Sequence, residues 1–525
     1  MLASAARAGG AGPARLTAVH ARLRSWPSLV LAVLVIASAA WRLPYWRDCL
    51  HDDAFISMRY ARHLAAGSGL TFNPGERVEG YTNFLWTVLL AAAVRLGANP
   101  VRLAPWLSLL PALLLILVVH RCGRRYGNVP HPGWALVAPF LVAAHPFLLA
   151  ESVGGLETTL FVLLAFVGFE RQIAELAGEA RAGSSAAAFA LATLVRPEGA
   201  LCFVVALAGR VLAARGVEWQ ARFRHDIATY LLLVAPLIAF RRAYYGDWVP
   251  NTFHAKVGWN WAQVARGARY VREWGGAVAP LPVLLLALAG LRGGGYRLTA
   301  ALLAGTYTLY VVAVGGDFAP TGRFVLLSIP FVALLVQSTV VRFATRPPAG
   351  RSRVAVALAA ALLAGAWSTV AERHWLQVRR WPESYRRDLA ARQYLGRYLG
   401  SMLPPGATIA VGSIGAIGYE SDRPLLDTFG LTNVEIGRKQ VEWMGHTSAG
   451  HEKGDADIVL RRAPEVIVFD RAFLSQRALE PEAFIAAARS PTEHLLVEDP
   501  RLFEMYGLRR VATPVGVLHF LEREH

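Results

Sequence analysis

Long apolar runs recur along the chain from Ser28 to Val370, and they decide what this sequence can fold into. Inside lipid every backbone N–H and C=O group needs an internal partner, so only helices and closed barrels cross a membrane. The runs are continuous rather than alternating, which favours helices over a barrel. The sequence, 54% hydrophobic over 525 residues, therefore predicts a polytopic α-helical membrane protein.

The first predicted crossing runs from Pro27 to Leu43, and the arginines before it place the tail of residues 1–25 in the cytoplasm. The segment from Thr82 to Leu96 decides the remaining topology. If it crossed fully, the arginine cluster of residues 121–125 would lie outside, against the positive-inside rule. We therefore expect it to dip into the membrane or to pack at the outer surface.

The other apolar runs alternate with few conflicts and give about 11 predicted crossings, several shorter than the ~20 residues of a perpendicular span. A transmembrane domain over residues 26–371 then has a first outer loop at 44–82 and another at 241–276. Residues 372–525 form an extracytoplasmic domain. The predicted crossings are residues 27–43, 101–120, 134–149, 156–169, 184–195, 199–212, 226–240, 277–291, 298–314, 324–341 and 354–370.

The net charge of +17 does not indicate a nucleic-acid partner. The basic residues lie mainly in short loops between apolar runs, which is typical of orientation charge and of affinity for anionic lipids in a plasma membrane. The outer loop 241–276 is an exception, because its six basic residues oppose the positive-inside rule and so indicate another role.

This topology gathers the polar motifs on the outer face. Asp52 and Asp53 lead a helix predicted from Ala54 to Ala66 and ended by Gly67. Paired carboxylates at a membrane surface suit an enzyme that deprotonates a hydroxyl group. The other motifs are Gly155-Leu156-Glu157-Thr158, Arg196-Pro197-Glu198-Gly199, the loop from Tyr244 to Lys256, and the loop from Gly315 to Phe324.

Each motif also has a structural interpretation. Asp53 alone would serve as the cap of its helix, and Glu157 as a charge favoured at a helix start. Arg196 and Glu198 would form a salt bridge. The next two loops also have structural interpretations. Tyr245 would anchor the membrane interface, and Asp317 and Arg323 would pair only with each other. His254 and Lys256, in contrast, suit phosphate recognition.

The C-terminal region reads as a small α/β unit with buried strands at 408–411 and 466–469. Its loop Asp427–Asn433 either touches substrate or closes the domain over the membrane part. Gly412, Gly415 and Gly418 follow the first strand without a dinucleotide-binding fingerprint. His446, His451 and Glu452 offer metal-ligand types without a regular element, so we expect a solvated loop there.

Together these motifs resemble the GT-C glycosyltransferases, most closely the actinobacterial terminal arabinofuranosyltransferases and their bacterial relatives. The resemblance spans nearly the whole chain. It implies a GT-C transmembrane fold and an inverting transfer of a sugar, a pentofuranose such as arabinofuranose, from a polyprenyl-phosphate donor. The acceptor would be a cell-envelope glycan or glycolipid at the outer face of the membrane.

The resemblance also implies roles for residues. Asp52 or Asp53 would be the catalytic base, or both would share a divalent cation such as Mg or Mn; no cofactor is otherwise expected. The remaining candidates divide into two sets. Donor-phosphate ligands would be Lys256, Arg196, Arg323 and Arg59, and other substrate-binding residues would be Glu157, Glu198, Tyr244, Tyr245, Asn251, His254 and Asp317.

Two other classes of function compete with this interpretation. A lipid or sugar transporter, or a flippase, would carry charges near mid-membrane in broken helices and an internal repeat, and neither is evident in the sequence. A non-catalytic scaffold for cell-wall assembly would keep its function without Asp52 and Asp53.

Overall fold

The structure is a computed structural model that describes residues 27–40, 49–213, 219–279, 281–291, 295–319, 321–345 and 385–524. Three predictions lie outside these described residues: the cytoplasmic tail 1–25, the last crossing 354–370, and the domain boundary at 371–372.

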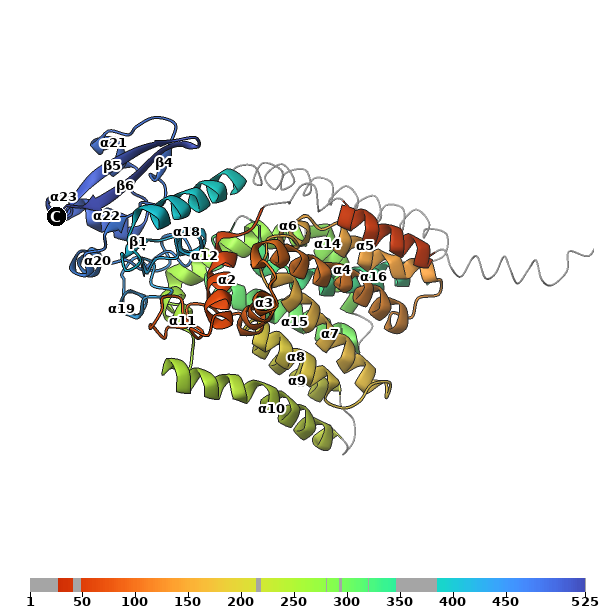
Figure 1. The fold of residues 1–525 in the computed structure, drawn as a ribbon. Helices are drawn as coiled ribbons and strands as arrows, with labels where there is room; N and C mark the ends of the chain where they lie inside the picture. Colours follow the sequence, from red (N-terminus) through yellow and green to blue (C-terminus); the bar gives the residue numbers. More distant parts are fainter. Residues whose placement is uncertain are drawn as a thin grey trace, which may run out of the picture.

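The N-terminal two thirds of the described chain is helical, and its elements are packed around one apolar core (Figure 1). A helix over residues 27–40 comes first. The elements that follow are α2 (Asp52–Ala65), α3 (Phe84–Arg95), α4 (Pro100–Tyr126), η1 (Pro132–Leu136), α5 (Val137–Ala143), α6 (Pro146–Glu151), α7 (Thr158–Leu176), α8 (Ser184–Val195), α9 (Gly199–Ala213), α10 (Trp219–Tyr245), α11 (Asn251–Lys256), α12 (Trp261–Tyr270), η2 (Val271–Gly275), α13 (Gly276–Val278), α14 (Leu281–Gly290), α15 (Tyr296–Ala313), η4 (Arg323–Val325) and α16 (Ser328–Thr345).

These helices occupy the predicted apolar segments, but some segments are divided into more than one helix. The predicted crossing 134–149 is broken at His145, because Pro146 has no N–H to continue a helix, and α5 and α6 lie on either side. Within the described residues, Pro100–Tyr126 and Gln220–Tyr245 are the helices long and apolar enough to cross a membrane by themselves. The count of 11 crossings therefore stays a prediction.

Helix α3 occupies the segment that decides the topology. Its 12 residues span about 18 Å, which is shorter than the ~30 Å hydrocarbon core of a bilayer. It packs against α2 and more loosely against α8. Because α8 is also 12 residues long and was predicted to cross, helix length does not decide the topology, and the placement of residues 82–96 stays a prediction.

The C-terminal region combines short helices with one mixed sheet. The sheet has the strand order β2-β1-β3-β6-β4, with β5 paired to β6. Strands β2, β1 and β3 are parallel, and β6 is antiparallel to β3, β4 and β5. Strands β1 and β3 were predicted, whereas β2, β4 and the β5–β6 hairpin were not.

A helix over residues 385–402 leads into this region. Its further elements are β1 (Ile409–Val411), α18 (Ile414–Ser421), β2 (Leu425–Asp427), α19 (Val434–Gly437), α20 (Ala456–Arg462), β3 (Val466–Ile467), β4 (Leu474–Ser475), α21 (Pro481–Ala486), α22 (Pro491–Glu498), α23 (Arg501–Met505), β5 (Tyr506–Thr513) and β6 (Gly516–Arg523).

Helix α2 forms the junction between the two regions. Figure 1 shows the sheet at one end of the molecule, with α2, α11 and α12 at the near end of the helical region. Helix α2 is buried on more than one face, since Phe55, Met58 and Arg59 are buried as well as Ile56 and Tyr60. The reason is that α2 lies between two helices. Helix α18 of the C-terminal region packs on one side of it, and α3 of the helical region packs on another.

Candidate active site

Asp52 and Asp53 are the first two residues of α2, where the partial positive charge of a helix start favours carboxylates. His51 is the N-cap residue, and its side chain makes no capping hydrogen bond. The interpretation of Asp53 as the cap of its own helix is therefore wrong. Because consecutive residues of a helix point about 100° apart, the two carboxylates face different neighbours.

Asp53 faces cations. Its Oδ2 accepts hydrogen bonds from Nη1 and Nη2 of Arg323 at 3.1 and 3.2 Å. Burial by itself would raise the pKa of Asp53, but the charges of Arg323 and Lys256 outweigh it and lower this pKa to about 2. With 30% of its side chain exposed, Asp53 is an ionised carboxylate that a ligand can still reach.

The turn after α15 positions Arg323. Gly315 and Gly316 have φ values of 86° and 73°, which side chains other than glycine rarely tolerate. They reverse the chain so that Asp317 binds Arg323 through both carboxylate oxygens, at 2.5 and 3.0 Å. The predicted Asp317–Arg323 pair is present, but the two residues do not pair only with each other, because the Arg323 guanidinium also binds Asp53.

Lys256 is the last residue of α11, and its charge stabilises the ionised form of Asp53. Gln263 fixes this end of α11 by donating from Nε2 to the carbonyl oxygens of Lys256 and Val314, both at 3.0 Å. Burial lowers the pKa of Lys256, against the opposing effect of Asp53. Within the described residues, the Lys256 ammonium group has no hydrogen bond or ion pair, so it is available to an anion.

Asp52 faces the C-terminal region instead. Its Oδ1 and Oδ2 accept from the backbone N–H groups of Ala416 and Gly415, at 2.9 and 3.2 Å, and thus cap helix α18. A Cβ atom at Gly415 would overlap the Asp52 carbonyl oxygen, so glycine permits this close approach. Burial raises the pKa of Asp52 to about 6, although the charge of Arg392 opposes the shift.

These contacts explain the glycine series after β1 without a cofactor. Gly415 and Gly418 lie on the face of α18 that packs on α2, and a Cβ at Gly418 would lie 2.9 Å from Nη1 of Arg59. Gly412 precedes α18 and lies against Asp470 and Phe429. The spacing therefore reflects close packing of two helices and a strand end.

Several residues near the carboxylates were missed from the sequence. Arg392 and Asp470, of the C-terminal region, lie near Asp52 and approach each other to 3.5 Å. His51 and Glu151 form a buried pair at 3.2 Å. Asp470 directly follows a predicted strand and Glu151 comes two residues after the predicted crossing 134–149, so both positions carried a signal, whereas Arg392 carried none.

Glu157, Arg196 and Glu198 form one buried network. Arg196 donates to Glu157 at 3.0 Å and to Glu198 at 2.9 Å, and Asn83 donates to the other oxygen of Glu157 at 2.7 Å. The Arg196 guanidinium also lies 5.2 Å from the centre of the Phe324 ring. The structural salt bridge is therefore present, and substrate contact by these three residues stays a prediction.

Arg59 and Asn251 connect the outer loops to the C-terminal region. Arg59 donates to the carbonyl oxygens of Phe72, Gly418 and Arg423, so all three guanidinium nitrogens are engaged. Asn251 donates to the carbonyl oxygens of Gly430 and Leu431 at 2.8 and 3.0 Å. The loop Asp427–Asn433 thus closes the C-terminal region over the outer loops, and donor binding by Arg59 has no geometric support here.

The remaining predicted substrate-binding residues also have protein partners. The Tyr245 hydroxyl donates to the Leu70 carbonyl at 2.9 Å, and the Tyr244 ring stacks on Phe240. His254 lies 3.0 Å from Asp247. In each case the contact holds a loop, and direct substrate contact stays a prediction.

Buried ion pairs account for part of the basic outer loop 241–276. Arg241 forms a two-pronged pair with Glu79, at 2.6 and 2.9 Å. Arg266 pairs with Glu452 at 2.5 Å, and Glu452 is fully buried. The expectation of a solvated loop around Glu452 is therefore wrong, because this carboxylate is packed against α12.

The residues do not fit a metal centre. No group of three His, Cys, Asp or Glu side chains suited to a metal ion occurs in the described parts of the chain. Asp52 and Asp53 point to different partners, one to the amides of α18 and the other to Arg323. A cation shared between them would have to displace both sets of contacts.

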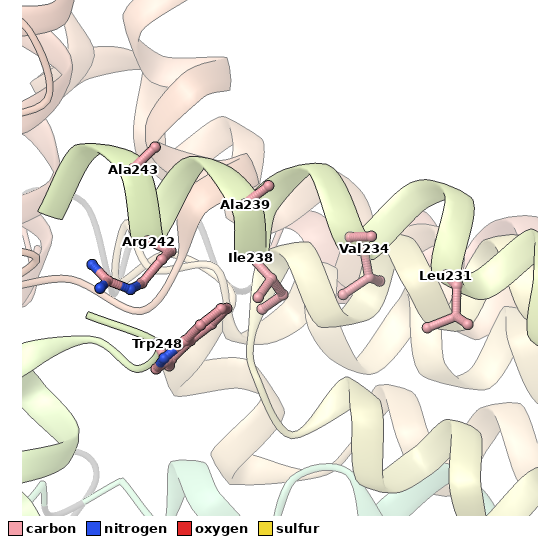
Figure 2. Close-up of a pocket in the computed structure, with 8 residues that line it drawn as sticks. Leu231, Val234, Ile238, Ala239, Arg242, Ala243 and Trp248 are labelled. Carbon is pink, nitrogen blue, oxygen red and sulfur yellow. The ribbon is translucent and has the colours of Figure 1, made fainter. Parts of the chain in front are cut away.

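An apolar groove of about 550 Å³ runs along α10, away from the carboxylates. Figure 2 shows Leu231, Val234 and Ile238 along one side of this helix, with Arg242 and Trp248 at one end. The Arg242 guanidinium lies 5.7 Å from the centre of the Trp248 ring. From Trp248 the chain continues directly into α11, which carries Lys256.

Comparison with known sequences identifies two similar curated proteins, both terminal β-(1→2)-arabinofuranosyltransferases. The protein from Mycobacterium tuberculosis is 33% identical over 298 residues, which cover 52% of this chain and 45% of the relative. The protein from Corynebacterium glutamicum is 30% identical over 359 residues, covering 59% and 50%. The chain thus spans about half the length of the relatives it matches. A domain of unknown function (DUF8728) matches residues 379–506.

Solved structures show the fold. ArnT from Cupriavidus metallidurans bound to undecaprenyl phosphate matches with a TM-score of 0.56 and 14% identity, over 93% of this chain and 97% of ArnT. The oligosaccharyltransferase AglB from Archaeoglobus fulgidus, in complex with an inhibitory peptide and a dolichol phosphate, matches with a TM-score of 0.56 and 12% identity, over 96% and 74%. The chain shares the fold of these two proteins, as the resemblance to GT-C glycosyltransferases implied.

The shared fold confirms the predicted helical region followed by a C-terminal sheet region, while the number of crossings and the outer placement stay predictions. The predicted resemblance to the terminal arabinofuranosyltransferases is also confirmed. In this GT-C fold the paired aspartates lie where the helical region meets the sheet region.

Proposed function

We propose that this protein is an inverting glycosyltransferase that moves a sugar from a polyprenyl-phosphate donor to a glycan or glycolipid of the cell envelope. The observation that carries the proposal is the reachable, ionised Asp53 beside Arg323 and Lys256, whose ammonium group has no hydrogen bond or ion pair to any described residue, on a GT-C fold. The similarity to terminal arabinofuranosyltransferases supports a pentofuranose such as arabinofuranose as the sugar.

In the proposed reaction Asp53 is the base. Its carboxylate takes the proton from an acceptor hydroxyl as that oxygen attacks the anomeric carbon of the donor sugar. The new C–O bond forms on the face opposite the phosphate, and the bond between the anomeric carbon and the phosphate oxygen breaks. Polyprenyl phosphate leaves with the bonding electron pair, so the configuration at the anomeric carbon inverts.

Lys256 and Arg323 would stabilise the negative charge that grows on the leaving phosphate. These same two cations hold the pKa of Asp53 at about 2, where it is a weak base. A bound phosphate would partly neutralise them and so raise the pKa of Asp53. Donor binding would thus make the base stronger at the moment it is needed.

Asp52 acts in this proposal as a positioning residue, because its carboxylate is engaged by two backbone N–H groups of α18. It would hold α2, and with it Asp53, in register with the C-terminal region. Use of a divalent cation such as Mg or Mn is not part of the mechanism, and the contacts of Asp52 and Asp53 give it no support.

The apolar groove along α10 would receive the polyprenyl chain, with Arg242 near its polar end. A tryptophan at Ile238 would fill this groove. We expect Ile238→Trp to raise the KM for a long-chain polyprenyl donor several-fold and to leave the KM for a donor with a short prenyl chain nearly unchanged. An equal change for both donors would contradict this location.

The proposal places the protein in the plasma membrane, with its N-terminus in the cytoplasm and the C-terminal region outside. A polytopic transporter or flippase for lipids or sugars is the competing function. It would move polyprenyl-phosphate sugars across a vesicle membrane without releasing polyprenyl phosphate.

Transfer in detergent tests the proposal. Purified full-length protein would receive polyprenyl-phospho-arabinofuranose or a polyprenyl-phospho-hexose together with an octyl arabinofuranoside acceptor. We expect equimolar polyprenyl phosphate and glycosylated product from the arabinofuranose donor, with inverted configuration. Folded protein that releases no polyprenyl phosphate from either donor, but moves donor across proteoliposomes, would establish the transporter.

A further inference from the structure

The carboxyl ends of three parallel strands of the C-terminal sheet face the proposed catalytic helix. Strand β1 lies between β2 and β3, so the chain leaves β1 for β2 on one side and reaches β3 on the other. This order creates a switch point at the carboxyl ends of β1 and β3, where open α/β sheets bind ligands. Here Ser413 follows β1, and Asp470 comes three residues after β3.

Asp470 has one engaged and one unengaged carboxylate oxygen. Its Oδ1 accepts from the Ser413 N–H at 3.1 Å and lies 3.5 Å from Nη1 of Arg392. Its Oδ2 is buried and has no hydrogen-bond partner among the residues that the structure describes. A buried carboxylate oxygen normally has a donor, and a ligand hydroxyl group can supply one.

Arg392 lies between this carboxylate and α2. The charges of Asp52 and Asp470 outweigh burial and raise the pKa of Arg392, whose side chain is 12% exposed. Its Nε is engaged by Asp388 at 3.0 Å. The guanidinium therefore brings further N–H donors to the boundary between the sheet edge and the start of α2.

His451 forms the other side of this boundary. Its ring contacts Phe318 and Phe429 edge-on, with ring centres 4.3 and 4.5 Å apart. Gly450, the residue before it, lies against the side chain of Lys256, and Phe318 is 40% exposed. Aromatic faces with nearby polar groups suit the mixed apolar and hydroxyl surface of a sugar ring.

We propose that Asp470, Arg392 and His451 form the acceptor subsite, which binds the terminal sugar of the acceptor glycan next to Asp53. The Oδ2 atom of Asp470 accepts a hydrogen bond from one hydroxyl group of this sugar, while His451 and Phe318 pack against the ring. The subsite assigns acceptor recognition to the matched domain of unknown function, residues 379–506. This inference rests on the proposed transferase function.

Kinetics with two varied substrates test the subsite. The donor is polyprenyl-phospho-arabinofuranose, and the acceptor is an octyl arabinofuranoside with a free 2-hydroxyl group, the position named in the linkage of the relatives. We expect Asp470→Asn to raise the acceptor KM about tenfold, because a hydrogen bond to a charged group is lost, while the donor KM changes less than about twofold. The matched control Asp457→Asn removes an exposed carboxylate of the same domain and should change neither KM.

A second pair of variants covers the case in which Asp470→Asn does not fold. His451→Ala should raise the acceptor KM several-fold, whereas His451→Phe keeps a ring and should stay near the wild-type value. Equal changes in both KM values together with a lower melting temperature would show a structural role and overturn the subsite. If wild-type protein transfers sugar and neither Asp470→Asn nor His451→Ala changes the acceptor KM, the subsite alone would be overturned. Wild-type protein without any transfer would overturn the proposed function and the subsite with it.

Discussion

The two sides of helix α2 use the same kind of residue for different purposes. On the side of the helical region, Asp53 meets Arg323 and Lys256, and its pKa is lowered to about 2. On the side of the sheet, Asp52 caps α18, and burial raises its pKa to about 6. The two pKa values differ because the cations outweigh burial at Asp53, whereas burial outweighs Arg392 and the N–H groups of α18 at Asp52.

This difference indicates that chemistry and architecture are divided between adjacent positions. The cationic side can receive an anionic leaving group, whereas the sheet side fixes the height and angle of α2. Substitutions on the cationic side should therefore act mainly on kcat, and substitutions on the sheet side mainly on stability.

The replacement Asp53→Asn should reduce kcat about 10²- to 10⁴-fold, because the amide cannot take a proton from the acceptor. Asp52→Asn should reduce kcat less than about tenfold, because an asparagine oxygen still accepts from one N–H group of α18. Initial rates of polyprenyl phosphate release measure both. Equal losses in the two variants would remove the distinction between base and positioning residue.

Loss of the Lys256 ammonium group should have the next largest effect on kcat. We expect Lys256→Met to lower kcat about 10²- to 10³-fold, because charge on the leaving phosphate is no longer neutralised. Lys256→Arg keeps a charge and should retain more activity. The control Lys439→Met alters a half-exposed lysine that pairs with Asp455, and activity equal to Lys256→Met in that variant would refute a specific role.

The contact between α2 and α18 should be sensitive to one methyl group. A Cβ at Gly415 would overlap the backbone of Asp52, so Gly415→Ala should lower the free energy of unfolding by about 1–3 kcal/mol. Gly406→Ala is the matched control, since a Cβ there meets no atom within 4 Å. Thermal unfolding in detergent compares them, and equal melting temperatures would mean that α18 can shift without cost.

The sequence predicted the elements whose signal is local. Helix α8 matches its predicted bounds, Ser184–Val195, because an uninterrupted apolar run between polar turns defines it. The sequence also singled out Asp52 and Asp53, which lie at the junction of the two regions, and a catalytic role for either stays a prediction. The hairpin β5–β6 was missed, because consecutive arginines at 509 and 510 disrupt the alternation typical of a strand.

The division of roles between the aspartates could not be read from the sequence. It depends on contacts between residues far apart in the chain: Asp53 with Arg323, 270 positions later, and Asp52 with Ala416, 364 positions later. The positions of Arg392 and Asp470 follow only after the sheet has formed and packed on α2. Local patterns carry no information on such pairings.

The smallest expected effect is a pH dependence that belongs to Asp52. Protonation near pH 6 weakens its charge-assisted hydrogen bonds to α18, so kcat/KM should fall a few-fold below that pH. In the protein without donor, Asp53 has a pKa of about 2 and therefore adds no change in kcat/KM near pH 6. The step should be absent in Asp52→Asn, whose amide does not titrate.

Stability should respond to the same proton with the opposite sign. The folded state holds the Asp52 proton more tightly than the unfolded state, because its pKa rises from 3.8 to about 6 on folding. The contribution of Asp52 to the free energy of unfolding therefore decreases as pH rises through this window. The melting temperature of wild type minus that of Asp52→Asn should decrease from pH 4 to pH 6. Over the same range the kcat/KM of wild type divided by that of Asp52→Asn should increase. A melting-temperature difference that instead rises with pH would show that the pKa of Asp52 is lowered on folding, and the step in kcat/KM near pH 6 would then belong to another group.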